Sequence, residues 1–412
     1  MNRRTAPPNQ TTKQSLARSA EALVAMSSFC DLHHELALCL AYVDFRDVCT
    51  LSATCRSLRA SCLAFLAERK SLDVSPLGIR SAGALRVAAK RCPLLEELIA
   101  EDVRCLSDAD LVPVLLATPK LRILRLRDLR HVSNAVLHAF IRPQPPLLEE
   151  LSLDGCRQIS DEVLEQLSTT SVTHTLKVLN LASTCITDTT VALMHRFRAL
   201  ESIDLSYTYE PDGVGYGGDG THWHITRSRG VTCAGLQRWF SACITEGVSL
   251  PLKSLRLSHR KLQHADWLGQ LTALRAKIEA LDVSHTGLSA DVLMLGVARL
   301  YKVSPCLHTL RMAALLPGDH GVVQEFALAC PGIRVLDLSN HNVLSDADLA
   351  ALSQTQVEDL TIVRCARITP RGLAELLTTT PNMRRLVCIR CVGDRHMRVL
   401  AKQHAHILIS WG

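Results

Sequence analysis

Apolar residues recur along most of this chain in the pattern L-x-x-L-x-L, in which x is usually polar or small. The pattern first appears as LEELIA at Leu95 and last as MRRLVC at Met383. Its fourth position falls at residues 98, 124, 151, 179, 203, 255, 281, 310, 336, 360 and 386, so most steps are 24 to 29 residues long. A period of this length predicts a solenoid in which similar units stack on one another.

Each repeat predicts a strand, a loop and a helix. The x-L-x-L-x stretch alternates as a strand with one buried face does, and a helical pattern such as SDEVLEQL, from Ser160 to Leu167, follows it. Ser or Thr before an acidic residue marks the expected helix starts. KSLDVS near Leu72 and ILISW near Ile407 predict a degenerate first repeat and a closing strand, giving about 11 to 13 repeats.

Cysteine often follows the predicted strand, as in GCRQISDEVL at Cys156 and RCARITPRGL at Cys365, and again at Cys105 and Cys185. The chain thus resembles the cysteine-containing class of leucine-rich-repeat proteins over about residues 70 to 410. The resemblance implies an α/β solenoid over residues 69–412, with parallel strands on the concave face and helices on the convex face. Polar residues such as Thr286 are expected to replace cysteine in the same internal ladder.

Apolar residues in the segment 29–68 have a different spacing, which predicts three short helices. A flexible tail is expected before them at residues 1–28. Leu32, Leu36 and Leu40 share one helical face, and Val48 begins a second apolar face after a polar turn. A third helix is expected through Cys62.

This segment resembles an F-box, a helical module that binds a Skp-type adaptor and, through it, a cullin. The residues that match the family pattern are Leu32, Glu35, Leu36, Val43, Asp44, Asp47, Val48, Leu51, Ser52, Cys55 and Arg56. His33 stands where the family has proline. The resemblance assigns adaptor binding to Leu32, Glu35, Leu36, Val43, Asp47, Val48 and Leu51. The alternative is a helical cap that covers the apolar edge of the first repeat.

The step from 203 to 255 is about twice the usual length and contains an insertion at 207–230. It is rich in glycine and is expected at the rim of the concave face, where Tyr209, Tyr216 and Trp223 are candidate target contacts. Long loops of this kind are either functional or disordered. A formal G-x-G-x-x-G at Gly213 lacks the following helix that a dinucleotide site needs.

Concave side chains can be assigned from the residue between the last two leucines of each repeat. Neighbouring strands lie about 4.8 Å apart, so these side chains are lateral neighbours. Five of them alternate in sign, namely Asp204, Arg256, Asp282, Arg311 and Asp337. We interpret the series as a self-neutralising ladder. The ladder is either structural or part of a mixed-charge surface that binds a protein target. For the second case, the candidate target-binding residues are Arg256, Asp282, Arg311 and Asp337. The alternation disfavours nucleic acid on this face.

Composition and charge exclude further classes of protein. The formal net charge of +6 is spread over the chain without a run of like charges, and no apolar stretch is long enough for a membrane span. The start MNRRTAPPNQ lacks the apolar stretch of a secretory leader, so the 16 cysteines are expected to be reduced thiols in the cytoplasm or nucleus. A mitochondrial leader from Lys13 to Met26 is an alternative. His222, His224, Cys388 and Cys391 are better explained by the loop and the repeat than by a metal.

No catalytic motif is present in the sequence, so we expect a binding protein without enzymatic activity, cofactor or metal. The F-box resemblance implies the substrate-recognition subunit of a Skp-cullin-F-box type ubiquitin ligase, which holds a target protein near the ligase. The alternative is a non-catalytic scaffold in a larger cytoskeletal or ciliary assembly, with the helical module as a cap.

Overall fold

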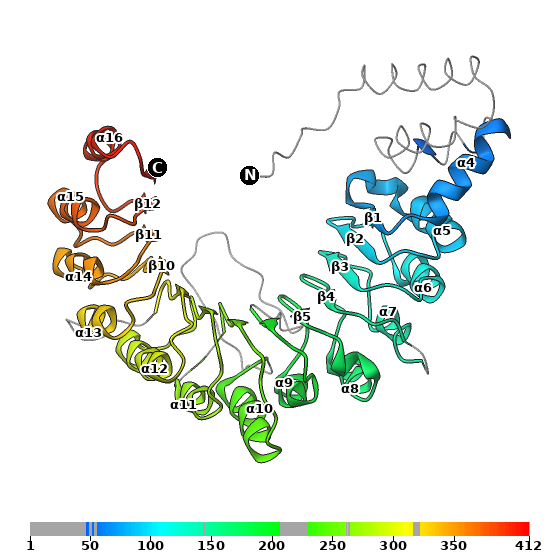
Figure 1. The fold of residues 1–412 in the computed structure, drawn as a ribbon, viewed down its shortest axis with the longest axis horizontal. Helices are drawn as coiled ribbons and strands as arrows, with labels where there is room; N and C mark the ends of the chain where they lie inside the picture. Colours follow the sequence, from blue (N-terminus) through cyan, green and yellow to red (C-terminus); the bar gives the residue numbers. More distant parts are fainter. Residues whose placement is uncertain are drawn as a thin grey trace.

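The computed structural model describes residues 47–48, 52, 56–142, 145–206, 230–260, 262, 264–315 and 322–411. Within this part, short parallel strands form one 13-stranded sheet in which every strand pairs with its neighbours in chain order. The sheet lines the inner side of an arc (Figure 1). The strands are β1 Ser71–Asp73, β2 Glu97–Glu101, β3 Ile123–Arg127, β4 Glu150–Ser152, β5 Val178–Asn180, β6 Ser202–Asp204, β7 Ser254–Arg256, β8 Ala280–Asp282, β9 Thr309–Arg311, β10 Val335–Asp337, β11 Asp359–Val363, β12 Arg385–Ile389 and β13 Leu408–Ser410.

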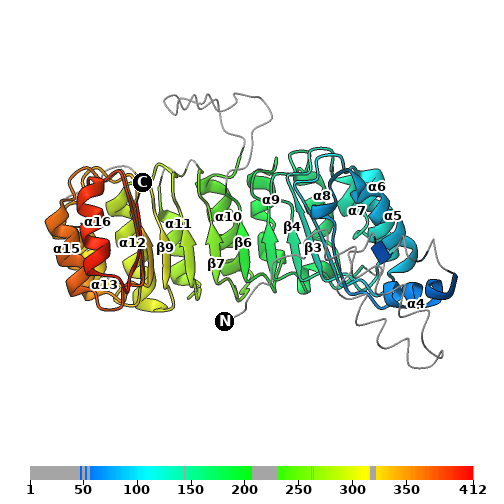
Figure 2. The same ribbon diagram turned by 90° about the horizontal axis from the view of Figure 1, so that it is seen from above.

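Helices cover the outer side of the arc, which Figure 2 shows from above. They are α4 Arg56–Ala67, α5 Ser81–Arg91, α6 Asp108–Ala117, α7 Ala135–His138, α8 Asp161–Leu167, α9 Asp188–Ala192, α10 Cys233–Thr245, α11 Asp266–Ala273, α12 Ala290–Val303, α13 Val322–Ala329, α14 Asp346–Ala351, α15 Pro370–Thr379 and α16 Asp394–Gln403. Short 3-10 segments occur at Ser75–Arg80, Ser171–His174, Met194–Arg196 and Leu352–Gln354. The predicted leucine-rich-repeat solenoid is confirmed, and both the degenerate first repeat and the closing strand supply a strand to the sheet.

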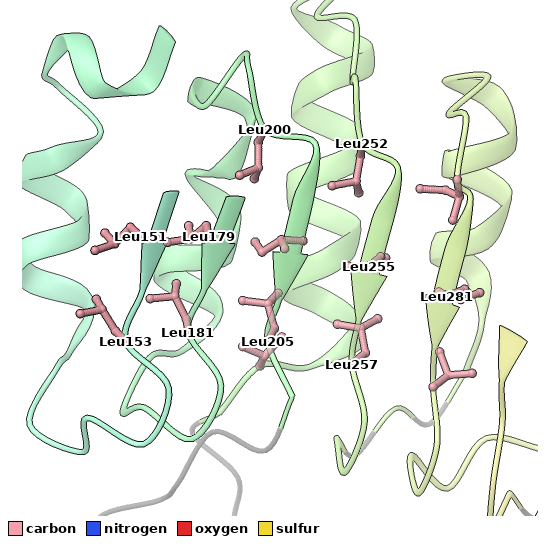
Figure 3. Close-up of a cluster of buried hydrophobic side chains, with 14 of the residues drawn as sticks. Leu151, Leu153, Leu179, Leu181, Leu200, Leu205, Leu252, Leu255, Leu257 and Leu281 are labelled. Atoms are coloured by element: carbon pink, nitrogen blue, oxygen red, sulfur yellow. The ribbon is translucent and has the colours of Figure 1, made fainter. Parts of the chain in front are cut away.

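One continuous hydrophobic core runs between the sheet and the helices. The fourth-position residue of each repeat is at most 1% exposed, and these residues stack in register from strand to strand, as Leu255 does on Leu281. The leucines two positions later, such as Leu257, form a parallel buried column (Figure 3). Because each column is shared by successive repeats, no repeat buries its apolar face without its neighbours.

A left-handed turn follows the strand in successive repeats. Ten residues other than glycine adopt positive φ, from Asp102 (57°) to Arg390 (56°), and most stand four positions after the central leucine. The turn directs the next side chain into the core, and where that side chain is polar it binds a backbone carbonyl. The Cys365 thiol donates to the Leu338 carbonyl at 3.4 Å and the His341 ring lies 2.7 Å from that of Met312.

This internal ladder corrects part of the cysteine assignment. Cys156 and Cys365 occupy the ladder position and are buried, and Thr286 and His341 occupy it in other repeats. Cys105 is exposed, and Cys185 is only partly buried. The prediction was wrong for these two because their cysteine stands one or two residues further from the strand.

A second ladder joins the helix starts of successive repeats. Asp161, the first residue of α8, accepts hydrogen bonds from the Thr187 amide at 2.8 Å and its hydroxyl at 2.6 Å. Asp188 binds the amide and hydroxyl of Thr232 in the same way at 2.7 and 2.6 Å, although 44 residues separate them. The acidic residues at the predicted helix starts therefore stabilise the next repeat, including the one beyond the insertion.

The insertion does not interrupt the stack. Strands β6 and β7 pair in register, with Ile203 opposite Leu255. The repeat helix resumes at α10 behind its N-cap Thr232. The long step in the sequence therefore adds no strand between β6 and β7.

Candidate protein-binding surface

The concave ladder has the predicted register but fewer ion pairs than predicted. Strand pairing places Asp204 beside Arg256, Arg256 beside Asp282, and Asp282 beside Arg311. Within the part of the chain that the structure describes, only Asp204 and Arg256 of this series form an ion pair, at 3.5 Å. The register is confirmed, whereas self-neutralisation along the whole series is not observed.

The aspartates of this series also bind their own backbone turns. Asp204, Asp282 and Asp337 each accept a hydrogen bond from the amide two residues later, at 2.9, 3.0 and 2.9 Å. Such a bond competes with pairing to the neighbouring strand but does not prevent it, since Asp204 caps its turn with one carboxylate oxygen and pairs with Arg256 through the other. Asp282, Arg311 and Asp337 remain partly exposed on the concave face, and Arg256 is exposed, so all four target-binding candidates are accessible.

A second alternating series, which the sequence analysis missed, lies at the edge of the sheet where the strands begin. It occupies the second position of L-x-x-L-x-L and reads Lys70, Glu96, Arg122, Glu149, Lys177, Glu201, Lys253, Glu279, His308, Arg334, Glu358 and Arg384. Its ion pairs include Lys70–Glu96 at 2.9 Å, Lys177–Glu149 at 3.0 Å, Lys253–Glu201 at 2.6 Å and Arg384–Glu358 at 3.0 Å.

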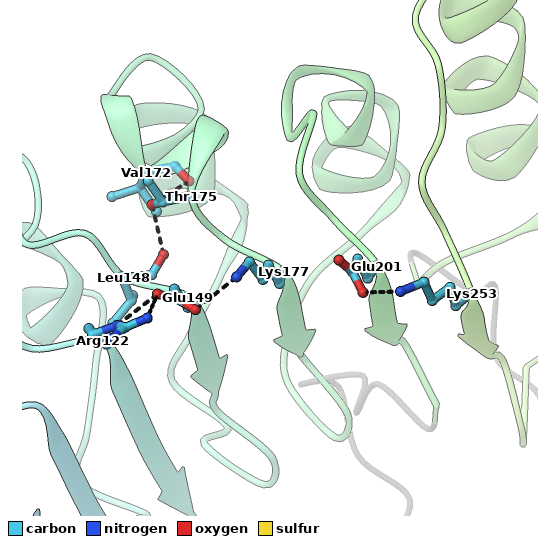
Figure 4. Close-up of polar contacts among 8 residues, drawn as sticks. All are labelled: Arg122, Leu148, Glu149, Val172, Thr175, Lys177, Glu201 and Lys253. Atoms are coloured by element: carbon cyan, nitrogen blue, oxygen red, sulfur yellow. Dashed lines mark hydrogen bonds and ion pairs between the residues drawn. The ribbon is translucent and has the colours of Figure 1, made fainter.

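Figure 4 shows the middle of this edge, where Glu149 lies between Arg122 and Lys177. Hydrogen bonds from Lys177 and Arg122 lower the pKa of the Glu149 carboxyl. Exposed pairs of this kind contribute little to stability, because solvent screens them. The sequence signal was the alternation of sign at this position, and its main effect is to leave little uncompensated charge on this edge.

The opposite edge, where the strands end, is the rim from which the insertion leaves. The imidazoles of His259 and His285 stack there with ring centroids 4.3 Å apart, and burial lowers the pKa of both. Arg260 occupies the internal ladder position, and its guanidinium donates to the Leu205 carbonyl. Burial lowers the pKa of Arg260 to about 9. This bond connects the turn after β7 to Leu205, which directly follows β6.

Most of the adaptor-binding candidates and three of the target-binding candidates lie outside the described residues. These are Leu32, Glu35, Leu36, Val43, Leu51, Tyr209, Tyr216 and Trp223. Asp47 and Val48 are described as helical. Asp47 is partly exposed, and Val48 is fully buried in the core of this chain.

The last helix of the N-terminal module packs on the first repeat. Helix α4 contacts α5, and its Cys62 and Leu66 are at most 1% exposed in the same core as Leu72 and Leu85. Helix α4 therefore covers the apolar end of the solenoid.

Three cysteines near the C-terminal end of the described chain lie close together. Cys388 is buried on β12, and Cys391 fills the next ladder position with its sulfur 3.3 Å from the Cys365 amide. Hydrogen bonds from Cys365 and Cys388 lower the pKa of the Cys391 thiol. The repeat thus accounts for the C-x-x-C spacing. No group of residues suited to a metal ion and no membrane-spanning helix occurs among the residues described.

His341 makes stability depend on pH. It is 5% exposed, and burial lowers its pKa from 6.5. Below pH 6.5 the unfolded chain therefore binds more protons than the folded chain, so the free energy of unfolding decreases on acidification. We expect His341→Asn, which replaces the ring by a neutral amide donor, to flatten the dependence of melting temperature on pH between about 7.5 and 5.5.

The control for this experiment is His138→Asn on α7, because His138 is exposed. It should leave the pH profile as in the wild type. An unchanged slope in His341→Asn would contradict the assignment, and acid sensitivity would then be attributed to other groups such as His259 and His285.

Comparisons with known proteins agree with the solenoid fold. No protein-family model matches the chain, and a search of curated proteins finds no match by sequence. Among solved structures, the crystal structure of the yeast Rad7 and Elc1 complex contains a similar chain, with 15% sequence identity and a TM-score of 0.59. The match covers 97% of this chain and 94% of that chain.

An internalin (inlF) from Listeria monocytogenes is also similar, with 13% identity and a TM-score of 0.49, over 85% of this chain and 88% of that one. The Rad7–Elc1 likeness supports a leucine-rich-repeat fold. Such a solenoid exposes a broad curved surface of the kind that binds other proteins.

Proposed function

We propose that this chain is the substrate-recognition subunit of a Skp-cullin-F-box type ubiquitin ligase and has no catalytic activity of its own. The observation that carries the proposal is the F-box-like segment placed directly before a leucine-rich-repeat solenoid. Helix α4 at the end of that segment is packed into the core of the first repeat. A module joined in this way would hold the adaptor in a fixed position relative to the target surface.

The mechanism is proximity. The adaptor side would connect the chain to a cullin, and the concave face and rim would bind a target protein. Tethering raises the effective concentration of target lysines at the ligase without chemistry on this chain. The described cysteines are free thiols, which suits a reducing compartment such as the cytoplasm or nucleus.

Two observations support this proposal without identifying the partners. The concave face carries accessible charged side chains of both signs, including Arg256 and Asp282, as protein interfaces often do at their rims. The similar yeast chain was solved in a complex with another protein, Elc1.

Packing of α4 also favours the second candidate, a static scaffold. A helix that buries Cys62 and Leu66 on the first repeat is what an end cap requires. In that case the helical segment would protect the core, and the repeats would be built into a larger cytoskeletal or ciliary assembly.

Co-purification with a Skp-type adaptor distinguishes the ligase subunit from the scaffold. We expect the full chain to form a stoichiometric complex with the adaptor on size-exclusion chromatography, and Leu36→Asp to weaken it by at least about tenfold. Val48→Asp is unsuitable, because Val48 is fully buried and its replacement would unfold the module. Glu35→Lys is the second variant, since a change of charge at a polar position preserves folding better.

Leu147→Asp is the matched control, because Leu147 is 64% exposed in the solenoid. It should leave adaptor binding unchanged. Thermal unfolding of each variant must match the wild type before binding is compared. Failure of the wild-type chain to bind the adaptor at any ratio would overturn the ligase proposal and favour the scaffold.

A further inference from the structure

Net positive charge is concentrated at the C-terminal end of the solenoid. Residues 355–412 contain nine of the 46 Lys and Arg residues and four of the 40 Asp and Glu residues. This segment therefore carries five of the six net positive charges of the chain. The remaining repeats are close to neutral.

Five arginines of this segment lie at or near the rim where the strands end, and we call them the C-terminal rim cluster. Arg364 directly follows β11 and Arg390 directly follows β12, and these strands pair through Val363 and Ile389. The cluster is completed by three arginines in the loop and helix starts that follow these strands, namely Arg367, Arg371 and Arg395.

All five side chains are exposed. None forms an ion pair or a side-chain hydrogen bond within the described ranges. Their neighbours at the opposite edge are neutralised, since Arg384 pairs with Glu358 at 3.0 Å and Arg385 with Asp359 at 2.6 Å. The nearby Asp346 carboxylate is occupied by Thr369, which donates to it from its amide and its hydroxyl. Two exposed acidic residues remain beside the cluster, Asp394 at the start of α16 and Glu375 one turn after Arg371 on α15.

Charge changes sign along the same rim. The left-handed turn position is Asp102 and Asp128 in early repeats, and Arg364 and Arg390 in late repeats. The charge at this one position of the turn is therefore negative in two early repeats and positive in two late repeats. Arginine is a costly residue for a left-handed turn, in which Gly, Asn and Asp are preferred.

The concave face beside the cluster is less polar than elsewhere. Val363, Val387 and Ile389 are partly exposed there. Corresponding positions on earlier strands carry charged residues such as Arg127. The surface thus combines arginines at its edge with apolar side chains on its floor.

We propose that the C-terminal rim cluster and these apolar strand residues form the docking site for an acidic segment of a protein partner. Glutamate or aspartate side chains would bind the arginine forks, which match carboxylate geometry, and apolar side chains of the segment would contact Val387 and Ile389. The inference deepens the proposed function and rests on its premise that the repeats bind a protein.

A protein segment fits these observations better than single-stranded RNA. Binding of bases without sequence preference relies on aromatic faces for stacking. After Phe326, the sequence contains a single Phe, Tyr or Trp, which is Trp411. An aliphatic floor matches leucine or valine side chains instead.

Fluorescence anisotropy with the full-length chain tests the proposal. The probes are a short labelled peptide of glutamates and leucines, the same peptide with glutamine in place of each glutamate, and an oligouridine of equal length. We expect the acidic peptide to bind most tightly and the affinity to fall with added salt. The double variant Arg364→Glu with Arg390→Glu should weaken acidic-peptide binding by roughly tenfold, because two attractions become repulsions.

The matched control is Arg104→Glu with Arg130→Glu, which makes the same change of net charge at two exposed arginines near the acidic end of the rim. It should alter the affinity by less than about twofold. An equal loss in both double variants, or no preference for the acidic over the glutamine peptide, would overturn the proposal. Tighter binding of oligouridine that depends on Arg364 and Arg390 would reassign the site to nucleic acid.

Adaptor binding is measured on the same samples, so the two proposals can fail separately. If the wild-type chain binds the adaptor but does not prefer the acidic peptide, this inference alone is refuted. A specific acidic-peptide site in a chain that binds no adaptor supports the inference and refutes the ligase.

Discussion

Replacing Leu281 by alanine should lower the free energy of unfolding of this protein by about 3 kcal/mol. Leu281 is the central strand residue of its repeat and is 1% exposed. It lies in register between Leu255 and Leu310, inside the leucine column of Figure 3. Truncation removes buried methyl groups and leaves a cavity that the flanking strands, fixed by their hydrogen bonds, cannot close.

Urea denaturation followed by circular dichroism measures this loss. Leu295→Ala on α12 is the matched control, because the same truncation at a side chain that is 51% exposed should change stability by less than about 0.5 kcal/mol. Similar losses in the two variants would show that the leucine column does not carry the stability of the stack. A decrease in the steepness of the transition would indicate that the two halves of the solenoid unfold separately.

The fold was predictable because the leucine pattern in the sequence has the same period as the stacked repeats that bury those leucines. A repeat with one apolar face must stack, and the spacing of its leucines determines the register of every strand. Even Leu72 and Ile407, where the motif is incomplete, marked the two ends of the sheet correctly. The N-caps were predictable for the same reason, although the inter-repeat bonds of Asp161 and Asp188 were not anticipated.

Polar contacts were harder to predict, because they depend on competition for each side chain. Alternating charges at Asp204, Arg256 and Asp282 indicated a ladder, yet Arg256 pairs with Asp204, and Asp282 binds the turn amide of Ser284 instead. Glu149 and Lys177 lie at the edge of the sheet where the strands begin. They have no such turn to cap, and they pair across neighbouring strands. The sign pattern was similar at both positions, so the pattern alone did not predict which charged residues pair.

The candidate site was only partly predictable. The concave positions followed from the repeat, but the arginines of the C-terminal rim cluster stand in loops and helix starts. Repeat periodicity does not specify those side chains. The predicted contacts Tyr209, Tyr216, Trp223 and Leu36 lie outside the described residues and stay predictions.

Asp161→Ala should be the most damaging single change among the polar residues, with a loss of about 2–4 kcal/mol. The Asp161 carboxylate accepts the amide and hydroxyl of Thr187 and the amide and hydroxyl of Thr190. Thr190 is fully buried, so removing the acceptor leaves its donors without a partner in the core. The carboxylate also lies at the first position of α8, where a negative charge stabilises the helix.

Two further variants separate these effects in chemical denaturation. Asp161→Asn keeps one carbonyl acceptor and loses the charge, so its stability should fall between those of the wild type and Asp161→Ala. Asp266→Ala is the control, since Asp266 also begins a helix but is 75% exposed and pairs only with the ring of His264 at 3.2 Å within the described residues. It should cost less than about 0.5 kcal/mol. Losses of equal size in Asp161→Ala and Asp266→Ala would reduce the role of Asp161 to that of a helix-start charge, and the ladder between repeats would then contribute nothing measurable.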